Sequence, residues 1–204
     1  VIWAGTDDGN LQYTIDGGKT WTNVSPNVAK CGVASQSWVS SIEPSKFDKN
    51  TVYATFENHM YGDHKTYLAK STDLGTTWTR LTSKEFVSFA HKIIEDLVNK
   101  DLLFLGTEMG IFATLDGGSN WFKLKTKIPE FALVRDLKIH PTTHDLVIAT
   151  HGRGIFILDD IRAIRNLTKE IWEKDIYLFP TPDIVLNNGP FGAGGPEISG
   201  GWVA

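Results

Sequence analysis

Short apolar runs of strand length alternate with polar turns along most of this chain. Two examples are Leu102–Leu105 and Leu146–Ala149, each preceded by a stretch containing the turn-forming residues Asn, Asp or Pro. Runs of this length, bounded by turn signals, are typical of β-strands. No run is long enough to cross a bilayer as a helix. The pattern therefore predicts an all-β protein.

The pattern recurs four times along the sequence. In each repeat, an apolar run ends in Gly-Thr or Ala-Thr, a polar turn follows, and a second run comes after it. A spacing of roughly 50 residues is typical of four-stranded β-propeller blades, and the threonines have about this spacing: Thr6, Thr55, Thr107 and Thr150. A further run precedes every repeat but the first, at Trp38–Ile42, Lys92–Ile94 and Val134–Ile139. We predict blades around 1–24, 38–81, 91–124 and 133–161, the first without its inner strand.

One polar motif lies between the third and fourth predicted strands of the first three repeats. In such a turn, the Asp accepts backbone hydrogen bonds, the Gly adopts positive φ, and the Trp ring is buried between sheets. Three copies with one spacing are unlike a single active site, so we interpret the motif as structural. Its positions are Asp16, Gly18 and Trp21, then Asp73, Gly75 and Trp78, then Asp116, Gly118 and Trp121.

The fourth repeat departs from this pattern, because Asp159-Asp160 is followed by neither the glycine nor the tryptophan. The residues that follow predict one or two short helical turns, with Asp160 and Thr168 as N-caps. A strand is expected to return at 176–180. Residues 183–204 are Gly-rich without periodicity, and we interpret them as a linker or remnant.

The recurring motif resembles the Asp-box of the BNR-repeat β-propellers, a group that includes sialidases, xyloglucanases and sortilin-type receptors. The resemblance covers roughly residues 1–182 and extends to stretches such as VSSIEPSKFDKNTVYATF, GTEMGIFATLDGG and ATHGRGIFILDD. Together they look like the second half of the propeller of large bacterial secreted proteins of a glycosyl hydrolase-like or sortilin-like subgroup. This implies a secreted or periplasmic protein and a partner in the rest of a larger propeller or in a second copy of the chain. The chain also begins inside a strand-like run, so we expect it to be an excised piece.

The resemblance further implies that the functional loops share one end of the sheets, with the Asp-box turns at the other. The functional end would collect three predicted catalytic carboxylates, Glu57, Asp63 and Glu108. It would also hold the predicted ligand-binding residues Asp7, Asp8, Trp38, His59, Arg135, His151 and Arg153, together with His91.

These residues lead to two hypotheses about function. A glycosidase needs one carboxyl group as acid and another as base or nucleophile, and the loop carboxylates supply candidates; the alternative is that they solvate loops or cap turns. A binding propeller would instead hold a carbohydrate or a peptide without turning it over, through the aromatic side chains Trp38, Tyr61, Phe86 and Phe89. A purely architectural propeller is a third possibility. A sialidase is not favoured, because we find no match to that family's arginine motif.

Arg153 lies between glycines, which would leave its guanidinium free to bind a carboxylate or sulfate. The alternative is a salt bridge to Asp136 or Asp159.

Composition and charge narrow the remaining classes. The 204 residues carry a net charge of −4 without a dense basic cluster, so we predict no nucleic-acid partner. One cysteine, Cys31, excludes an internal disulfide. His59, Asp63 and His64 match no metal-binding motif, and there is no Gly-rich phosphate loop. We therefore predict neither metal nor cofactor.

Overall fold

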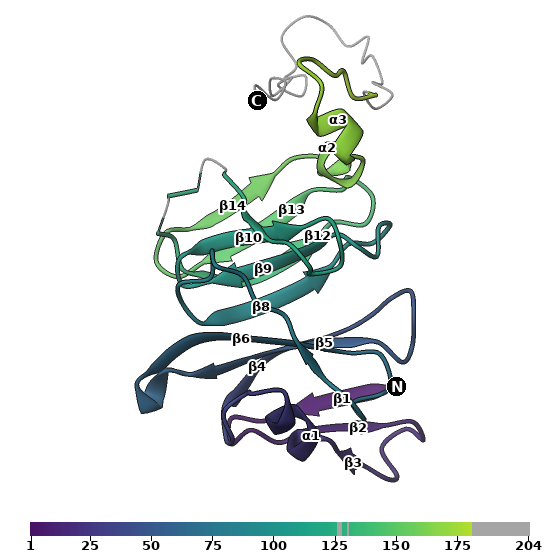
Figure 1. Cartoon of the computed structure of the whole chain (residues 1–204), viewed down its shortest axis with the longest axis vertical. Coiled ribbons are helices and arrows are strands. Elements are labelled where there is room, and N and C mark those ends of the chain that lie inside the picture. Colours follow the sequence, from purple (N-terminus) through teal and green to yellow (C-terminus); the bar gives the residue numbers. More distant parts are fainter. Residues whose placement is uncertain (126–127, 130, 181–204) are drawn as a thin grey trace, which may run out of the picture. The chain divides into compact units, whose positions relative to one another are not determined.

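Four antiparallel sheets follow one another along the chain (Figure 1). The structure is a computed structural model that describes residues 1–125, 128–129 and 131–180. It divides into two units, Val1–Thr168 and Lys169–Ala204, and all four sheets belong to the first.

Each sheet is built from strands that are consecutive in sequence and pair in that order. The first sheet has three strands, β1 (Ile2–Gly5), β2 (Leu11–Thr14) and β3 (Thr22–Asn23). The second has four, β4 (Trp38–Pro44), β5 (Val52–Asn58), β6 (Asp63–Ser71) and β7 (Thr79–Arg80). The third also has four, β8 (Ala90–Glu95), β9 (Leu103–Thr107), β10 (Gly110–Thr114) and β11 (Phe122–Lys123). The fourth has three, β12 (Val134–Ile139), β13 (Leu146–Thr150) and β14 (Ile155–Leu158).

Three short helices lie in the connections of the first unit. They are α1 (Ser25–Lys30), the 3-10 turn η1 (His59–Tyr61) and α2 (Arg162–Arg165). Asp160 Oδ1 accepts a 3.2 Å hydrogen bond from the backbone N–H of Arg162, although the N-cap position itself is Ile161. Asp160 therefore bonds the start of α2 from one residue outside the predicted position.

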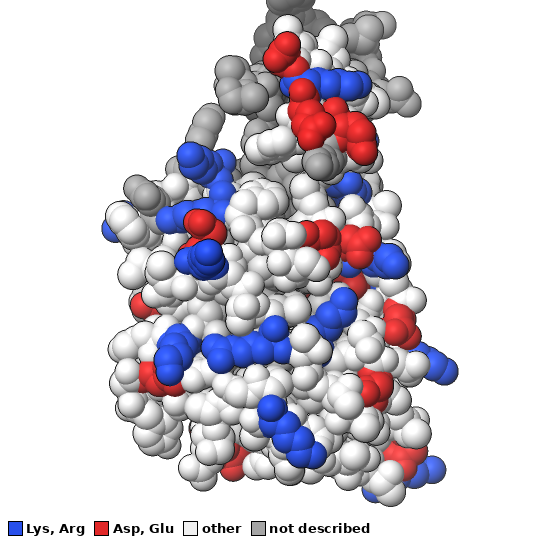
Figure 2. Space-filling view, in the orientation of Figure 1, with Lys and Arg blue, Asp and Glu red and all other residues white. Residues whose placement is uncertain are grey.

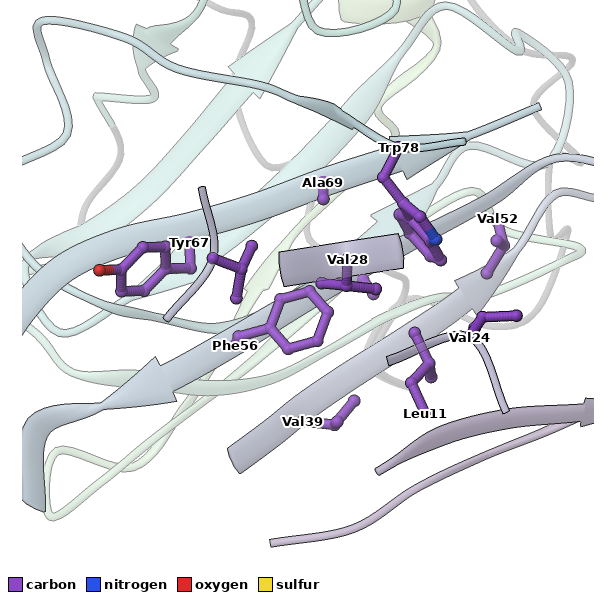
Figure 3. Packing of buried hydrophobic residues seen from close by; sticks show 11 residues of the cluster. Leu11, Val24, Val28, Val39, Val52, Phe56, Tyr67, Ala69 and Trp78 are labelled. Atoms are coloured by element: carbon purple, nitrogen blue, oxygen red, sulfur yellow. The ribbon is translucent and has the colours of Figure 1, made fainter. Parts of the chain in front are cut away.

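The hydrophobic core consists of three clusters, each placed between two consecutive sheets. Figure 3 shows the first, where Leu11 and Val28 of the first repeat face Phe56 and Trp78 of the second. The second joins the second and third sheets, and the last joins the third and fourth. The middle sheets are thus covered on both faces, which explains why β5, β9 and β10 are almost entirely buried.

The recurring turns lie between the last two strands of the first three sheets; we call Asp16–Trp21, Asp73–Trp78 and Asp116–Trp121 the aspartate turns. Each carboxylate accepts hydrogen bonds from a hydroxyl two residues before it and from the backbone N–H and side chain of the residue four after it; Asp16 also accepts one from the backbone N–H of Lys19. These bonds hold the pKa of Asp16, Asp73 and Asp116 below the ordinary value for aspartate, against the opposing effect of burial.

Two of the three tryptophans are buried against the preceding sheet. Trp78 Nε1 donates to the carbonyl of Gly75 at 3.1 Å, and Trp121 Nε1 donates to that of Gly118 at 3.0 Å. Trp21 is 43% exposed, so the prediction that it is buried between sheets was wrong. The reason is that the described residues contain no sheet before the first one.

The second unit is described for residues 169–180 and contains α3 (Lys169–Trp172). The strand predicted at 176–180 is absent from these residues, and Ile176 and Leu178 are 82% and 88% exposed. A lone apolar run without a partner strand to pair with therefore stays irregular. The predicted linker, 183–204, lies outside the described residues.

Candidate functional site

Three side chains are directed to one end of the sheets by irregularities in strand pairing. The register of β5 with β6 shifts between Phe56 and Asn58, and Glu57 is the residue between them. The register of β8 with β9 shifts around His91, and that of β12 with β13 around Arg135. A bulge re-aims a side chain and is common beside functional sites. Bulges in three successive sheets thus present Glu57, His91 and Arg135.

These residues form a polar cluster with His59 and Glu108, of which only Glu57 and His91 are buried. Glu57 Oε1 lies against His59 Nδ1, and Glu57 Oε2 lies 3.2 Å from His91 Nδ1. His91 Nδ1 is also 3.2 Å from Arg135 Nη1, and His91 Nε2 is 3.9 Å from Glu108 Oε1. The side chains of Glu57 and His91 are only 1% and 3% exposed, whereas that of Glu108 is 31% exposed. The cluster therefore has a buried centre with Glu108 toward the solvent.

His91 cannot satisfy all of its neighbours as a neutral imidazole. If Nδ1 carries the proton, it donates to Glu57 and cannot accept from Arg135; if Nε2 carries the proton, Nδ1 can accept from Arg135 but cannot donate to Glu57. His91 Nε2 is buried and has no hydrogen-bond partner among the described residues. A doubly protonated ring would direct Nδ1–H to Glu57 and Nε2–H toward Glu108, but it could not accept from Arg135.

Beside this cluster, an open groove of about 680 Å³ runs along the start of β6. Three large apolar side chains at or next to it are strongly exposed: Met60 at 82%, Tyr61 at 77% and Val87 at 72%. The lining residues are Tyr61, Gly62, Asp63, His64, Lys65, Thr66, Phe86 and Val87.

Asp63 is part of the groove wall and not of the polar cluster. Its carboxylate accepts a 2.5 Å hydrogen bond from the Tyr67 hydroxyl and a 3.2 Å bond from the backbone N–H of Lys65. The Tyr67 bond is the main reason that the pKa of Asp63 lies below the ordinary aspartate value. Asp63 is therefore held as an ionised carboxylate.

Of the aromatic residues expected to be exposed, Phe89 is packed inside and Phe86 is partly covered. Phe89 is only 5% exposed, because the His59 ring stacks on it at 4.9 Å and His91 meets it edge-on at 5.1 Å. Phe86 packs partly on Phe112. The expectation of an exposed aromatic surface was wrong for Phe89, whereas Trp38 and Tyr61 are exposed.

The side chains of the other predicted ligand residues make no hydrogen bond or ion pair with the cluster in the part of the chain that the structure describes. Asp8 is bound within its own turn by Thr6 and Asn10, and the Thr6 hydroxyl is the main cause of its lowered pKa. Trp38 pairs with Glu57 across the β4–β5 ladder and is 40% exposed. The three remaining predicted ligand residues, Asp7, His151 and Arg153, are also exposed. Asp136 pairs with Lys92 at 3.6 Å, not with Arg153.

Sequence reasoning placed His91 at the functional end but not in the candidate site, and it missed Met60 and Val87. The signal for His91 is its position, equivalent to Arg135, at the start of an inner strand. Val87 lies between Phe86 and Phe89 in a segment without strand periodicity, so only the groove identifies it.

The remaining features of the described residues that bear on a ligand are the surface charge and the potential for metal or membrane binding. Figure 2 shows a band of Lys and Arg across the middle of one face, with acidic side chains scattered around it. Among the described residues there is no group of three or more His, Cys, Asp or Glu side chains that could hold a metal ion. No helix among them is long and apolar enough to span a membrane.

Solved structures share the fold of this chain. They include YCF48 bound to D1 peptide, with 22% identity, a TM-score of 0.54, and coverage of 77% of this chain and 47% of that one. The GH74 enzyme of Niastella koreensis has 18% identity, a TM-score of 0.59, and coverage of 78% and 26%. The GH74 xyloglucanase from Xanthomonas campestris has 12% identity, a TM-score of 0.60, and coverage of 78% and 27%.

These similarities establish the fold as part of a β-propeller, which confirms the predicted fold class. The chain spans about a quarter to about half of the length of these structures. No protein-family model and no curated protein matches the chain.

Proposed function

We propose that this chain is the ligand-binding portion of an Asp-box β-propeller, and that its groove beside β6 binds an extended segment of another polypeptide. The observation that carries the proposal is the exposure of Met60, Tyr61 and Val87 around an open groove of about 680 Å³. Exposed apolar side chains gathered in one place mark interaction sites. The volume is within the range of ligand sites.

The carboxylates support binding rather than hydrolysis. A glycosidase needs a protonated acid and a second carboxylate, both facing the substrate. Glu57 is 1% exposed beneath His59, and the lowered pKa of Asp63 keeps that group ionised. Glu108 is the one member of the predicted catalytic set that is partly open to solvent while facing His91.

The YCF48 structure adds support by analogy, since it was solved with a bound peptide on a similar fold. That similarity carries no residue assignment to this chain.

Carbohydrate binding is the second candidate function. Trp38 is 40% exposed and pairs with Glu57 across the β4–β5 ladder, so a flat ring lies close to a strand end that carries polar groups. Sugar rings stack on such aromatic faces. The GH74 neighbours share the fold and not a demonstrated site.

The test is selection of peptides from a displayed combinatorial library on the immobilised chain, followed by calorimetry of the best binder. Tyr61→Ser and Val87→Ser should each weaken that peptide at least about tenfold, as expected for apolar anchors at an interface. Val98→Ser is the matched control, because Val98 is 60% exposed but lies in the turn between β8 and β9. Equal affinity of the peptide for the wild type and the three variants would refute the proposal that the groove binds it. Binding of xyloglucan oligosaccharides that is lost in Trp38→Ala would favour the second candidate.

A partner for the fourth sheet is also proposed. Ile155 and Ile157 of β14 are 71% and 59% exposed, whereas the residues equivalent to Ile155 in the three sheets before it are each buried against the following sheet; they are Leu11, Leu68 and Ile111. We propose that another sheet, from a larger propeller or a second copy of the chain, packs there.

A further inference from the structure

The centre of the polar cluster is a carboxylate held between two imidazoles. One oxygen of Glu57 faces His59 Nδ1, and the other faces His91 Nδ1 at 3.2 Å. Glu57 Oε1 and His59 Nδ1 are both buried and make no hydrogen bond among the described residues, so the contact between them gains most when it is an ion pair. A carboxylate that is 1% exposed needs a charged or hydrogen-bonding partner, because burial disfavours its ionised form.

The charges around Glu57 do not balance when both imidazoles are neutral. Glu57 and Glu108 are two carboxylates, and Arg135 is the one Lys or Arg side chain found in contact with the cluster in the described residues. One proton taken up by His59 or His91 removes the excess negative charge. The titratable or charged groups facing the cluster from all the packed elements are Glu57, His59, Asp63, His64, His91, Glu108 and Arg135.

His59 links the charges around Glu57 to the groove. It belongs to η1, which continues through Tyr61 and Gly62 into the groove wall. Two contacts hold the His59 ring: Glu57 at Nδ1, and the stacked Phe89 ring. Only the contact with Glu57 depends on the charge of the His59 ring. Protonated His59 forms an ion pair with Glu57, and neutral His59 does not.

We propose that protonation of His59 regulates the groove. Protonation of His59 holds η1, and with it the Tyr61 side of the groove, against Glu57. Deprotonation of His59 as the pH rises releases this segment. The proposal extends the proposed function, because it treats the groove as the ligand site. Ligand binding should therefore be stronger at acidic pH, where the imidazole is protonated, than at alkaline pH.

The first experiment needs no ligand. The amide resonances of Tyr61 and Gly62 are followed by NMR in the ¹⁵N-labelled chain between pH 5.0 and 8.5. In the wild type they should follow a single titration curve, and amide exchange at these residues should be slower at the acidic end. His59→Gln should abolish the titration. His140→Gln is the matched control, since His140 is exposed in the turn between β12 and β13 and none of the ion pairs found in the described residues includes it.

Titration that persists in His59→Gln, or is lost in His140→Gln, would overturn the proposal. Calorimetry with the selected peptide then measures the effect on binding. Because His59 is 37% exposed, solvent screening limits the gain, and we expect about two- to fivefold tighter binding at pH 5.5 than at pH 8.0. This difference should vanish in His59→Gln. A normal NMR titration in a chain that binds no peptide would refute the proposed function alone.

Discussion

The buried ion pair between Asp96 and Arg165 can be compared with an exposed ion pair of the same helix, and this comparison gives a prediction about stability. Arg165 Nε donates to Asp96 Oδ2 at 2.7 Å, and Arg165 Nη2 donates to Asp96 Oδ1 at 2.6 Å. The side chains are 6% and 0% exposed. The pair fastens α2 to the turn between β8 and β9, and so holds the third and fourth sheets together. Arg165→Met keeps most of the side-chain volume but leaves a buried carboxylate without its cation.

We expect Arg165→Met to lower the free energy of unfolding by about 3–5 kcal/mol at pH 7. Such a loss is a large part of the stability of an ordinary domain. The matched control is Arg162→Met in the same helix. Arg162 pairs with Asp160 at 2.6 Å, but these side chains are 38% and 35% exposed, so the loss should be about 0–1 kcal/mol.

The pH dependence supplies a second check on the same variant. Burial alone would raise the pKa of Asp96, but Arg165 and the N–H groups of Asn99 and Val98 lower it in the wild type. The stabilisation is therefore present above the unfolded pKa near 3.9 and is lost as the pH falls through the lower folded value. In Arg165→Met, burial is no longer opposed by the cation, so the destabilisation should grow as the pH rises.

Urea unfolding followed by far-UV circular dichroism measures both variants, with the slope against urea compared to confirm the same transition. Equal losses in Arg162→Met and Arg165→Met, or a loss below about 1 kcal/mol in the latter, would refute the reasoning.

Two further predictions concern packing and the aspartate turns. Gly106→Ala should cost about 1–3 kcal/mol, measured by thermal unfolding, because the new Cβ would lie 2.7 Å from Val134 Cγ1; an unchanged melting temperature would contradict this. Asp73→Ala should cost about 1 kcal/mol at pH 7, because the carboxylate loses its bonds to Ser71 and Thr77. Since the pKa of Asp73 is lowered, the wild-type advantage should persist above about pH 4 and shrink below it in acid unfolding curves; a constant difference down to pH 2 would argue against the assignment.

The strands were predictable because each repeat carries its own periodic signal. A run such as Val134–Ile139 has the length and alternation of a strand, and its turn residues mark where it ends. The aspartate turns were predictable for the same local reason, since each carboxylate bonds residues within its own turn. The burial of the tryptophans in these turns was not predictable, because it depends on the neighbouring sheet: Trp78 is covered and Trp21 is not.

The candidate site was predictable only as a list of residues from one end of the sheets. The sequence does not show that bulges bring Glu57, His91 and Arg135 into one cluster, because a bulge changes pairing without changing composition. It also could not separate Asp63 from that cluster, since the separation depends on the Tyr67 hydroxyl.

Amide hydrogen–deuterium exchange of the chain with and without its selected peptide tests the central claim most directly. Slower exchange in the bound state at 61–66 and 86–87, with no change at 151–154, is the result that peptide binding in the groove predicts. Protection confined to Trp38 and 108–110, or no protection anywhere in a chain saturated with peptide, would contradict it.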